Sequence, residues 1–177
     1  FSLEEAVGKI RGPKGTKVNL TLQAADSSIR DVEIVRDVIK TKTIAGKMLE
    51  NDIGYIRISM FSENTAQDFA VKLEELDKLG MKKLVLDLRS NPGGLLDSCV
   101  KIANNLIPKG LIVSVVDKDG NKQEYLSKLE KSKYQLVVLV DKGSASASEI
   151  IAGAVKDSKA GTIVGQTTYG KGSVQTI

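Results

Sequence analysis

The sequence contains no histidine and only one cysteine, and these two shortages exclude several kinds of active site. A Ser-His-Asp triad, a Cys-His pair and a histidine-rich zinc site all need an imidazole, so any hydrolytic chemistry requires another base. With Cys99 alone, neither an intrachain disulfide nor a CxxC metal or redox pair can form. Long apolar runs are missing as well, because none approaches the roughly 20 residues that a membrane span needs.

Aromatic residues are also few, with three Phe, four Tyr and no Trp among 177 residues. Few aromatic side chains are therefore available to stack on nucleobases. The 26 Lys and Arg residues are interspersed with 22 Asp and Glu, for a net charge of +4. A solvated, lysine-rich surface explains this charge better than nucleic-acid binding does. The 41% of hydrophobic and 27% of charged residues describe a globular chain of ordinary domain size.

The first 24 residues predict a short helix, a turn and a strand. Ser2 and Glu5 have the spacing of a capping box, and the helix that follows is expected to end at Ile10. Glycine and proline over residues 12–15 predict a turn, and the alternation of polar and apolar residues over 17–23 predicts a half-buried strand. These elements are too few to bury a core by themselves.

Further along the chain, strands alternate with helices, which predicts α/β layers around a largely parallel sheet. The nearly continuous apolar run over residues 84–88 indicates a strand that is buried on both faces. The runs over 112–116 and 136–140 indicate further buried strands. In all, strands are expected near residues 32–35, 53–58, 84–88, 112–116 and 136–140, and helices near 66–80, 96–106 and 149–155.

Two loops follow predicted strands, at the position where α/β sheets place their ligands. Residues 87–94 end in a pair of glycines, and residues 141–149 carry serines at positions 144, 146 and 148. Small side chains at the start of a helix leave backbone N–H groups uncovered, and such groups can bind an anion. Taken singly, the glycines are explained by an ordinary turn and each serine by helix capping. Composition alone therefore does not choose among the three serines.

Lys171 stands between two glycines, so no neighbouring side chain separates it from the protein backbone. Burial disfavours an ammonium group, and a buried lysine can act as general base toward a serine hydroxyl. The ordinary alternative for Lys171 is a charged, exposed loop tip. Residues 165–171 also match most of a phosphate-binding loop, with Asp87 as the candidate magnesium ligand. Three details count against that loop: Gly172 replaces the required hydroxyl, the residues after it predict a strand, and the strand with the aspartate comes first.

Together the motifs resemble the C-terminal processing, or tail-specific, proteases of peptidase family S41. The resemblance rests on residues 87–95, 143–150 and 169–175, three motifs in the order that the family has. It implies an α/β fold: a layered ββα core of the ClpP/crotonase type with a mostly parallel sheet. Residues 1–24 resemble the last helix and strand of a PDZ domain. Residues 25–177 resemble the protease core, which in the family continues with further strands.

The resemblance implies a serine endopeptidase with a Ser-Lys dyad. Ser146 matches the nucleophile, Lys171 the general base, and Gln175 the residue that positions the lysine. In the implied reaction, Ser146 attacks the scissile carbonyl while neutral Lys171 takes its proton and later gives it to the leaving amine. The product of the first step is an acyl-enzyme. The resemblance implies no metal and no cofactor.

The resemblance also assigns an oxyanion hole, a substrate class and a location. The main-chain N–H groups of Gly94 and Ala147 match the oxyanion hole, with Gly93 leaving room for Gly94. Asp141 stands where the family usually has Asn. Family members recognise proteins by apolar C-terminal tails, which a PDZ domain captures by strand addition and carboxylate binding. An extracytoplasmic location is expected: periplasm, cell envelope or secreted. A homo-oligomer and a membrane anchor before residue 1 stay open, and no nucleic-acid partner is expected.

Other function classes stay open from the sequence. In a fragment that only scaffolds or assembles such a protease, Ser146→Ala would change nothing measurable other than stability. A nucleotide-binding protein would gain thermal stability from ATP or GTP with magnesium. A crotonase-like acyl-CoA enzyme would share the layered architecture and a backbone oxyanion hole, but it would not need both Ser146 and Lys171.

Overall fold

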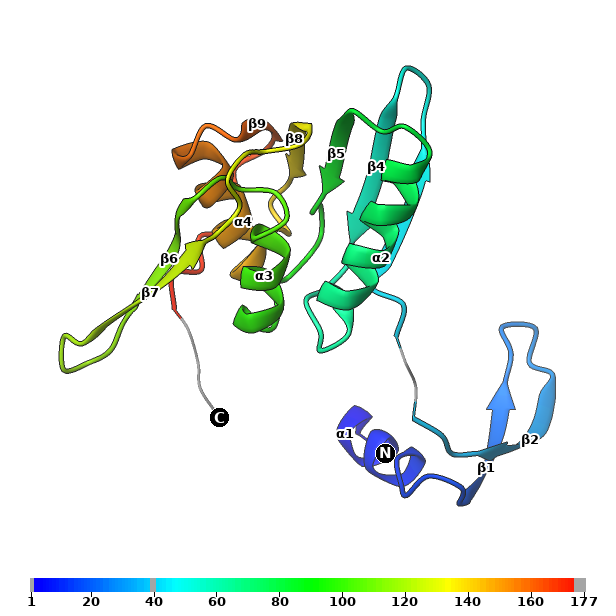
Figure 1. Cartoon of the computed structure of the whole chain (residues 1–177). Helices are drawn as coiled ribbons and strands as arrows, with labels where there is room; N and C mark the ends of the chain where they lie inside the picture. The colour runs from blue at the N-terminus through cyan, green and yellow to red at the C-terminus, as the bar shows by residue number, and fades with distance from the viewer. Residues whose placement is uncertain (1, 39–40, 174–177) are drawn as a thin grey trace. The chain divides into compact units, whose positions relative to one another are not determined.

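The computed structural model describes residues 2–38 and 41–173. The chain divides into two compact units, Phe1–Thr41 and Lys42–Ile177 (Figure 1). Within the described residues, none of the helices combines the length and the apolar character that a membrane span requires.

The first unit consists of helix α1 (Leu3–Ile10) and a hairpin of strands β1 (Lys17–Gln23) and β2 (Ile29–Val35). The predicted capping box is present: the Ser2 amide donates to Glu5 Oε2 at 2.8 Å, and the Glu5 amide donates to Ser2 Oγ at 3.2 Å. At the other end of α1, the guanidinium of Arg36 donates to two main-chain carbonyls. These carbonyls lie in the last turn, where a helix has no partners of its own. Main-chain groups at both ends of this short helix therefore have hydrogen-bond partners.

Strand β2 was expected to belong to the second unit, but it pairs with β1 in the first. The expected boundary between the units lies at residues 24 and 25, which places β2 with the second unit. In the structure β2 pairs antiparallel with β1 from end to end, with Val18 opposite Ile34, and the division falls after Thr41. Periodicity identifies a strand but carries no information on its partner, so the sequence pattern could not place this boundary.

The second unit is built on a five-stranded sheet with the order β3-β4-β5-β8-β9. Its strands are β3 (Ile44–Met48), β4 (Ile53–Ile58), β5 (Lys83–Asp87), β8 (Gln135–Val140) and β9 (Gly161–Gly165). Strand β3 runs antiparallel to β4, and all the other pairs are parallel. This arrangement confirms the predicted α/β class with its mostly parallel sheet.

Three helices cover this sheet: α2 (Thr65–Lys78), α3 (Leu96–Ala103) and α4 (Ala147–Asp157). Successive parallel strands are added in one direction, so right-handed crossovers place the connecting helices on the same face. Helix α2 packs on β3 and β4, α3 contacts both α2 and α4, and α4 packs on β9 (Figure 1). The helices therefore form a single layer.

The core lies between the sheet and this helix layer. Its fully buried side chains come from alternate positions of the strands and from the inner faces of the helices, among them Ile56, Ile58, Leu86, Val138, Phe69, Ile102 and Ile151. Strand β5 was expected to be buried on both faces, but Val85 between two buried leucines is only half-buried. The prediction was wrong because helices cover one face of this sheet in the described residues, whereas fully parallel sheets are usually covered on both.

The strand expected over residues 112–116 also joins a different sheet. Strand β6 (Gly110–Val116) pairs antiparallel with β7 (Lys122–Ser127) in a separate hairpin, to the left of α3 in Figure 1. Ile112 is buried, but Val116 is 61% exposed. A run of β-branched residues is typical of any strand, and the sequence does not distinguish the centre of a sheet from such a hairpin.

Candidate active site

The two loops singled out in the sequence meet at the carboxyl ends of β5 and β8, which are parallel neighbours. Ser144 Oγ donates to the Leu88 carbonyl at 2.8 Å, and Ser148 Oγ donates to the Asn91 carbonyl at 3.0 Å. Both serines are completely buried. Two of the three serines therefore join the loops, and their hydroxyls are engaged in that structural role.

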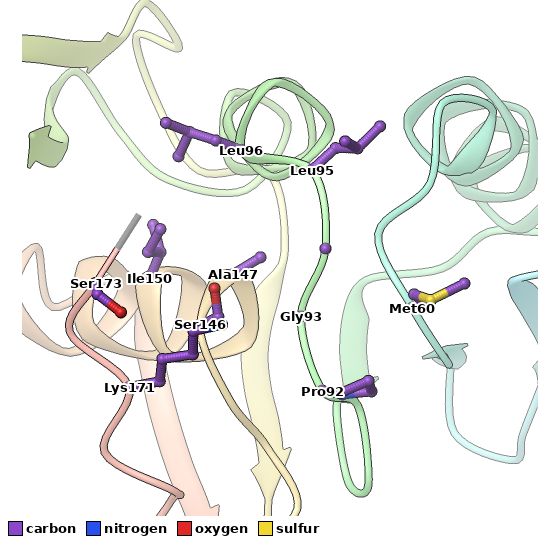
Figure 2. A pocket seen from close by; sticks show the side chains of 11 residues that line it. Met60, Pro92, Gly93, Leu95, Leu96, Ser146, Ala147, Ile150, Lys171 and Ser173 are labelled. Atoms are coloured by element: carbon purple, nitrogen blue, oxygen red, sulfur yellow. The ribbon is translucent and has the colours of Figure 1, made fainter. Parts of the chain in front are cut away.

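Of the three serines in this loop, Ser146 lines a pocket. The pocket has a volume of about 380 Å³ and contains five of the six residues predicted for the site. In Figure 2, Ser146 and Lys171 lie on one side of the pocket, and the loop that includes Gly93 lies on the other. Its lining residues are Met60, Pro92, Gly93, Gly94, Leu95, Leu96, Ser146, Ala147, Ile150, Lys171 and Ser173. The sixth predicted residue, Gln175, lies outside the described residues.

Ser146 has an unusual backbone conformation for a residue with a side chain, with φ at +53° and ψ at −113°. Such conformations are strained and occur most often at functional sites. Ser146 is also the N-cap of α4, so it occupies a sharp turn between strand β8 and the helix. The start of a helix carries a partial positive charge, which favours negative charge developing nearby. A turn of this kind presents a serine side chain at the top of a sheet.

Gly93 and Gly94 each lie too close to another part of the backbone for a side chain to fit. A Cβ on Gly93 would lie 2.8 Å from the Ser146 Cβ and 3.0 Å from the Ala147 nitrogen, and its φ is +99°. A Cβ on Gly94 would lie 2.1 Å from the Phe61 carbonyl oxygen. Gly93 was expected to make room for Gly94. The structure corrects this reason, because Gly93 makes room for the Ser146 turn.

Two main-chain N–H groups at the pocket are available to a ligand. Among the residues that the structure describes, the N–H groups of Gly94 and Ala147 have no hydrogen-bond acceptor. The neighbouring Leu95 and Gly93 amides, in contrast, donate to Phe61 O and Asn91 Oδ1. Unpaired N–H groups that line one pocket can stabilise an oxyanion.

Of the two states of Lys171 considered from the sequence, a buried base and a charged loop tip, the structure has the exposed one. Lys171 follows β9 in a segment without regular secondary structure, and its side chain is exposed. The flanking glycines provide no side chains to cover it. Within the described part of the chain, no hydrogen bond joins Lys171 Nζ to Ser146 Oγ, although both residues line the same pocket.

Glu149 also belongs to the site, and sequence reasoning did not single it out. Its carboxylate accepts hydrogen bonds from the amides of Ser146, Gly170 and Lys171 and from the Thr168 hydroxyl. Burial raises the pKa of Glu149, but the four hydrogen bonds together lower it by more than burial raises it. The pKa of Glu149 therefore lies below its usual value. The available signal was its position three residues after Ser146, which is the spacing of a capping box.

Asp87 anchors the start of the diglycine loop and was considered in the sequence only as a metal ligand. Its fully buried carboxylate accepts hydrogen bonds from the Tyr55 hydroxyl at 2.6 Å and from two nitrogens of the Arg89 guanidinium at 2.8 and 2.9 Å. Burial raises the pKa of Asp87, but the bonds from Arg89 and Tyr55 outweigh it and lower the pKa to about 2. Asp87 thus acts as an ionised structural anchor.

This anchor predicts a specific dependence of stability on pH. A carboxyl with a lower pKa in the folded than in the unfolded state stabilises the fold above its unfolded pKa, and this contribution disappears as the pH falls through the folded pKa. We expect the difference in unfolding free energy between wild type and Asp87→Asn to shrink by about 2 kcal/mol from pH 5 to pH 2. Urea unfolding at each pH measures it. A difference that stays constant with pH would contradict the anchor.

Comparisons with known proteins agree with this geometry. The model of peptidase family S41 matches residues 52–177. The carboxy-terminal processing protease CtpA of Bacillus subtilis (strain 168) is 43% identical over 178 residues, which are 99% of this chain and 38% of that protein. A carboxyl-terminal-processing protease of Synechocystis sp. is 38% identical over 183 residues, covering 100% of this chain and 43% of that protein. The photosystem II D1 C-terminal processing protease superimposes with a TM-score of 0.70 at 34% identity, over 99% of this chain and 50% of that one.

The chain therefore belongs to peptidase family S41, as its motifs predicted. The structural match also confirms the predicted α/β core. The chain spans about two fifths of the length of these curated relatives.

Proposed function

We propose that this chain carries the catalytic site of a serine endopeptidase of the C-terminal processing type. The observation that supports it most is the composition of the pocket at the start of α4. There the strained Ser146 turn, the unpaired N–H groups of Gly94 and Ala147, and the amine-bearing Lys171 come together. Membership of family S41 supports the class of reaction, and the names of the relatives support the type of substrate.

The proposed reaction begins when Ser146 Oγ attacks the scissile carbonyl and its proton passes to the neutral amine of Lys171. The carbonyl oxygen becomes an oxyanion that accepts hydrogen bonds from Gly94 and Ala147. The lysine then protonates the leaving amine, and water hydrolyses the acyl-enzyme at Ser146. Because Lys171 is exposed in the free chain, we propose that a bound substrate covers it, and exclusion of water favours the neutral amine. Gln175 is proposed to orient this amine.

The proposed substrates are proteins with apolar C-terminal tails. Met60, Leu95 and Ile150 give the pocket apolar walls, which suit an apolar side chain beside the scissile bond. We propose that residues 1–24 are the end of a PDZ domain, supported by the helix and strand that form there as predicted. An extracytoplasmic location is proposed on the resemblance to family members that are exported.

A nucleotide-binding function is less well supported by the site. A phosphate-binding loop offers consecutive backbone N–H groups to the phosphates. Here the amides of Gly170 and Lys171 already donate to the carboxylate of Glu149, at 2.7 and 2.9 Å. A negative charge therefore occupies the place that a phosphate would take.

Trapping of the acyl-enzyme tests the proposal directly. The chain is incubated with a short peptide ester that ends in alanine, quenched with acid and digested with trypsin. Esters acylate serine enzymes quickly, so the intermediate accumulates. We expect the acyl group on the tryptic peptide of residues 143–156, with fragment ions that place it on Ser146 and not on Ser144 or Ser148. Consumption of the ester with the acyl group on another residue would contradict the mechanism.

The close approach at Gly93 gives a second test. Gly93→Ala introduces a Cβ next to the Ala147 nitrogen, in the space proposed for the oxyanion, and at an unfavourable φ. We expect kcat/KM for a fluorogenic peptide to fall about 100-fold or more, as for the loss of an oxyanion-hole donor. Gly153→Ala is the matched control, because a Cβ there has nothing within 4 Å, and its activity should equal that of wild type. Equal activity of both variants would argue against the proposed oxyanion hole.

A further inference from the structure

We infer that Glu149 is a positioning residue whose carboxylate holds the segment that carries Lys171 against the turn that carries Ser146. This inference rests on the proposed function, because it concerns the same site. Glu149 lies in the first turn of α4, and the lysine segment follows β9, so the carboxylate joins two parts of the chain about 20 residues apart.

The geometry is that of a carboxylate with every acceptor position filled. Oε1 accepts from the Thr168 hydroxyl at 2.8 Å and from the Gly170 amide at 2.7 Å. Oε2 accepts from the Lys171 amide at 2.9 Å and from the Ser146 amide at 2.8 Å. An ionised carboxylate offers about four lone-pair sites, and all its partners here are donors. One side chain therefore fixes the backbone of both proposed catalytic residues.

The lysine segment has few other means of being fixed. Residues 166–173 form neither helix nor strand, and most of their side chains are exposed. Gly170 has a φ of +88°, and its N–H and that of Lys171 converge on one carboxylate, as in an anion-binding nest. The Tyr169 amide adds one more bond to the nucleophile loop, to the Ser144 carbonyl at 3.0 Å. The position of the Lys171 backbone is thus set mainly by Glu149.

The isosteric variant Glu149→Gln is the sharpest test, because it replaces one acceptor oxygen by an NH₂ group that faces two donors. Displacing a reacting group by about 1 Å can cost about 100-fold in rate. We expect kcat of Glu149→Gln to fall about 100-fold while KM changes little. Thr168→Val, which removes one of the four donors, should lower kcat less, and Thr168→Ser should keep it. Asp157→Asn, which removes a carboxylate from the exposed end of the same helix, is the matched control.

Amide hydrogen exchange measured by NMR gives a readout that needs no catalysis. In Glu149→Gln the amides of Gly170 and Lys171 should exchange at least about tenfold faster than in wild type, whereas those of β5 should not change. Thermal unfolding followed by circular dichroism shows whether the variant is folded, and Thr168→Val repeats the exchange test if it is not.

The outcomes separate this inference from the proposed function. Faster exchange at Gly170 and Lys171 together with a lower kcat supports the positioning role. If the wild-type chain cleaves no peptide but the two amides still exchange faster in Glu149→Gln, the positioning role is supported. The missing cleavage then counts only against the proposed function. Unchanged exchange at these two amides in folded variants overturns the inference, whatever happens to the rate.

Discussion

Ser146→Ala is expected to lower kcat/KM for a peptide substrate by at least about 1,000-fold, because Ser146 carries its hydroxyl on the strained turn beside the unpaired N–H groups of Gly94 and Ala147. Ser144 and Ser148 are fully buried, and their hydroxyls donate to carbonyls of the diglycine loop, so neither can attack a substrate. The oxyanion hole and substrate binding leave a small residual rate, which is why the expected loss is large but finite. A fluorogenic peptide with an apolar C-terminus provides the assay.

Ser158→Ala is the control for this substitution. Ser158 lies at the opposite end of α4, where its hydroxyl donates to the Ala154 carbonyl at 2.6 Å. Its replacement should leave kcat/KM unchanged and affect only stability, by about 1 kcal/mol or less. If the Ser146→Ala variant keeps its activity, and this activity co-purifies with the variant protein, another residue is the nucleophile.

Replacement of Lys171 is expected to have the second largest effect. Lys171→Met keeps the length of the side chain and removes the amine, and we expect kcat/KM to fall by about 1,000-fold. Lys171→Arg keeps the positive charge but cannot lose a proton near neutral pH, so it should be as inactive as the methionine variant. The comparison separates a general base from a group that only supplies charge.

The same assay on a lysine outside the pocket completes this test. Lys156→Met, at an exposed lysine in the last turn of α4, is the control and should behave as wild type. An active Lys171→Arg variant would show that the lysine acts through its charge.

Local signals in the sequence predicted much of the secondary structure. The capping box at Ser2 and Glu5 predicted the start of α1, and the helix expected near residues 66–80 is α2. What the pattern could not provide was the partner of each strand. β2 and β6 both pair in hairpins outside the five-stranded sheet, because pairing is decided by contacts that periodicity does not encode.

The site was predicted through its motifs, but the functions of single residues needed the structure. Three serines in one loop look alike in composition; the resemblance matched Ser146 to the nucleophile, and the structure separates it from its neighbours by burial and position in the pocket. Asp87 and Glu149 act through donors that lie far along the chain, such as Tyr55 and Lys171, so local patterns did not reveal their partners. Whether Lys171 is buried or exposed was left open by the sequence, because it depends on what packs around the loop.

Mass spectrometry of the products from an unstructured protein with an apolar C-terminus tests the central proposal most directly. The protein is incubated with the wild-type chain, with Ser146→Ala and with Lys171→Ala under identical conditions. The account predicts internal peptide-bond cleavage by the wild-type chain and intact protein with both variants. Equal cleavage by all three, or no cleavage by the wild-type chain, would contradict it.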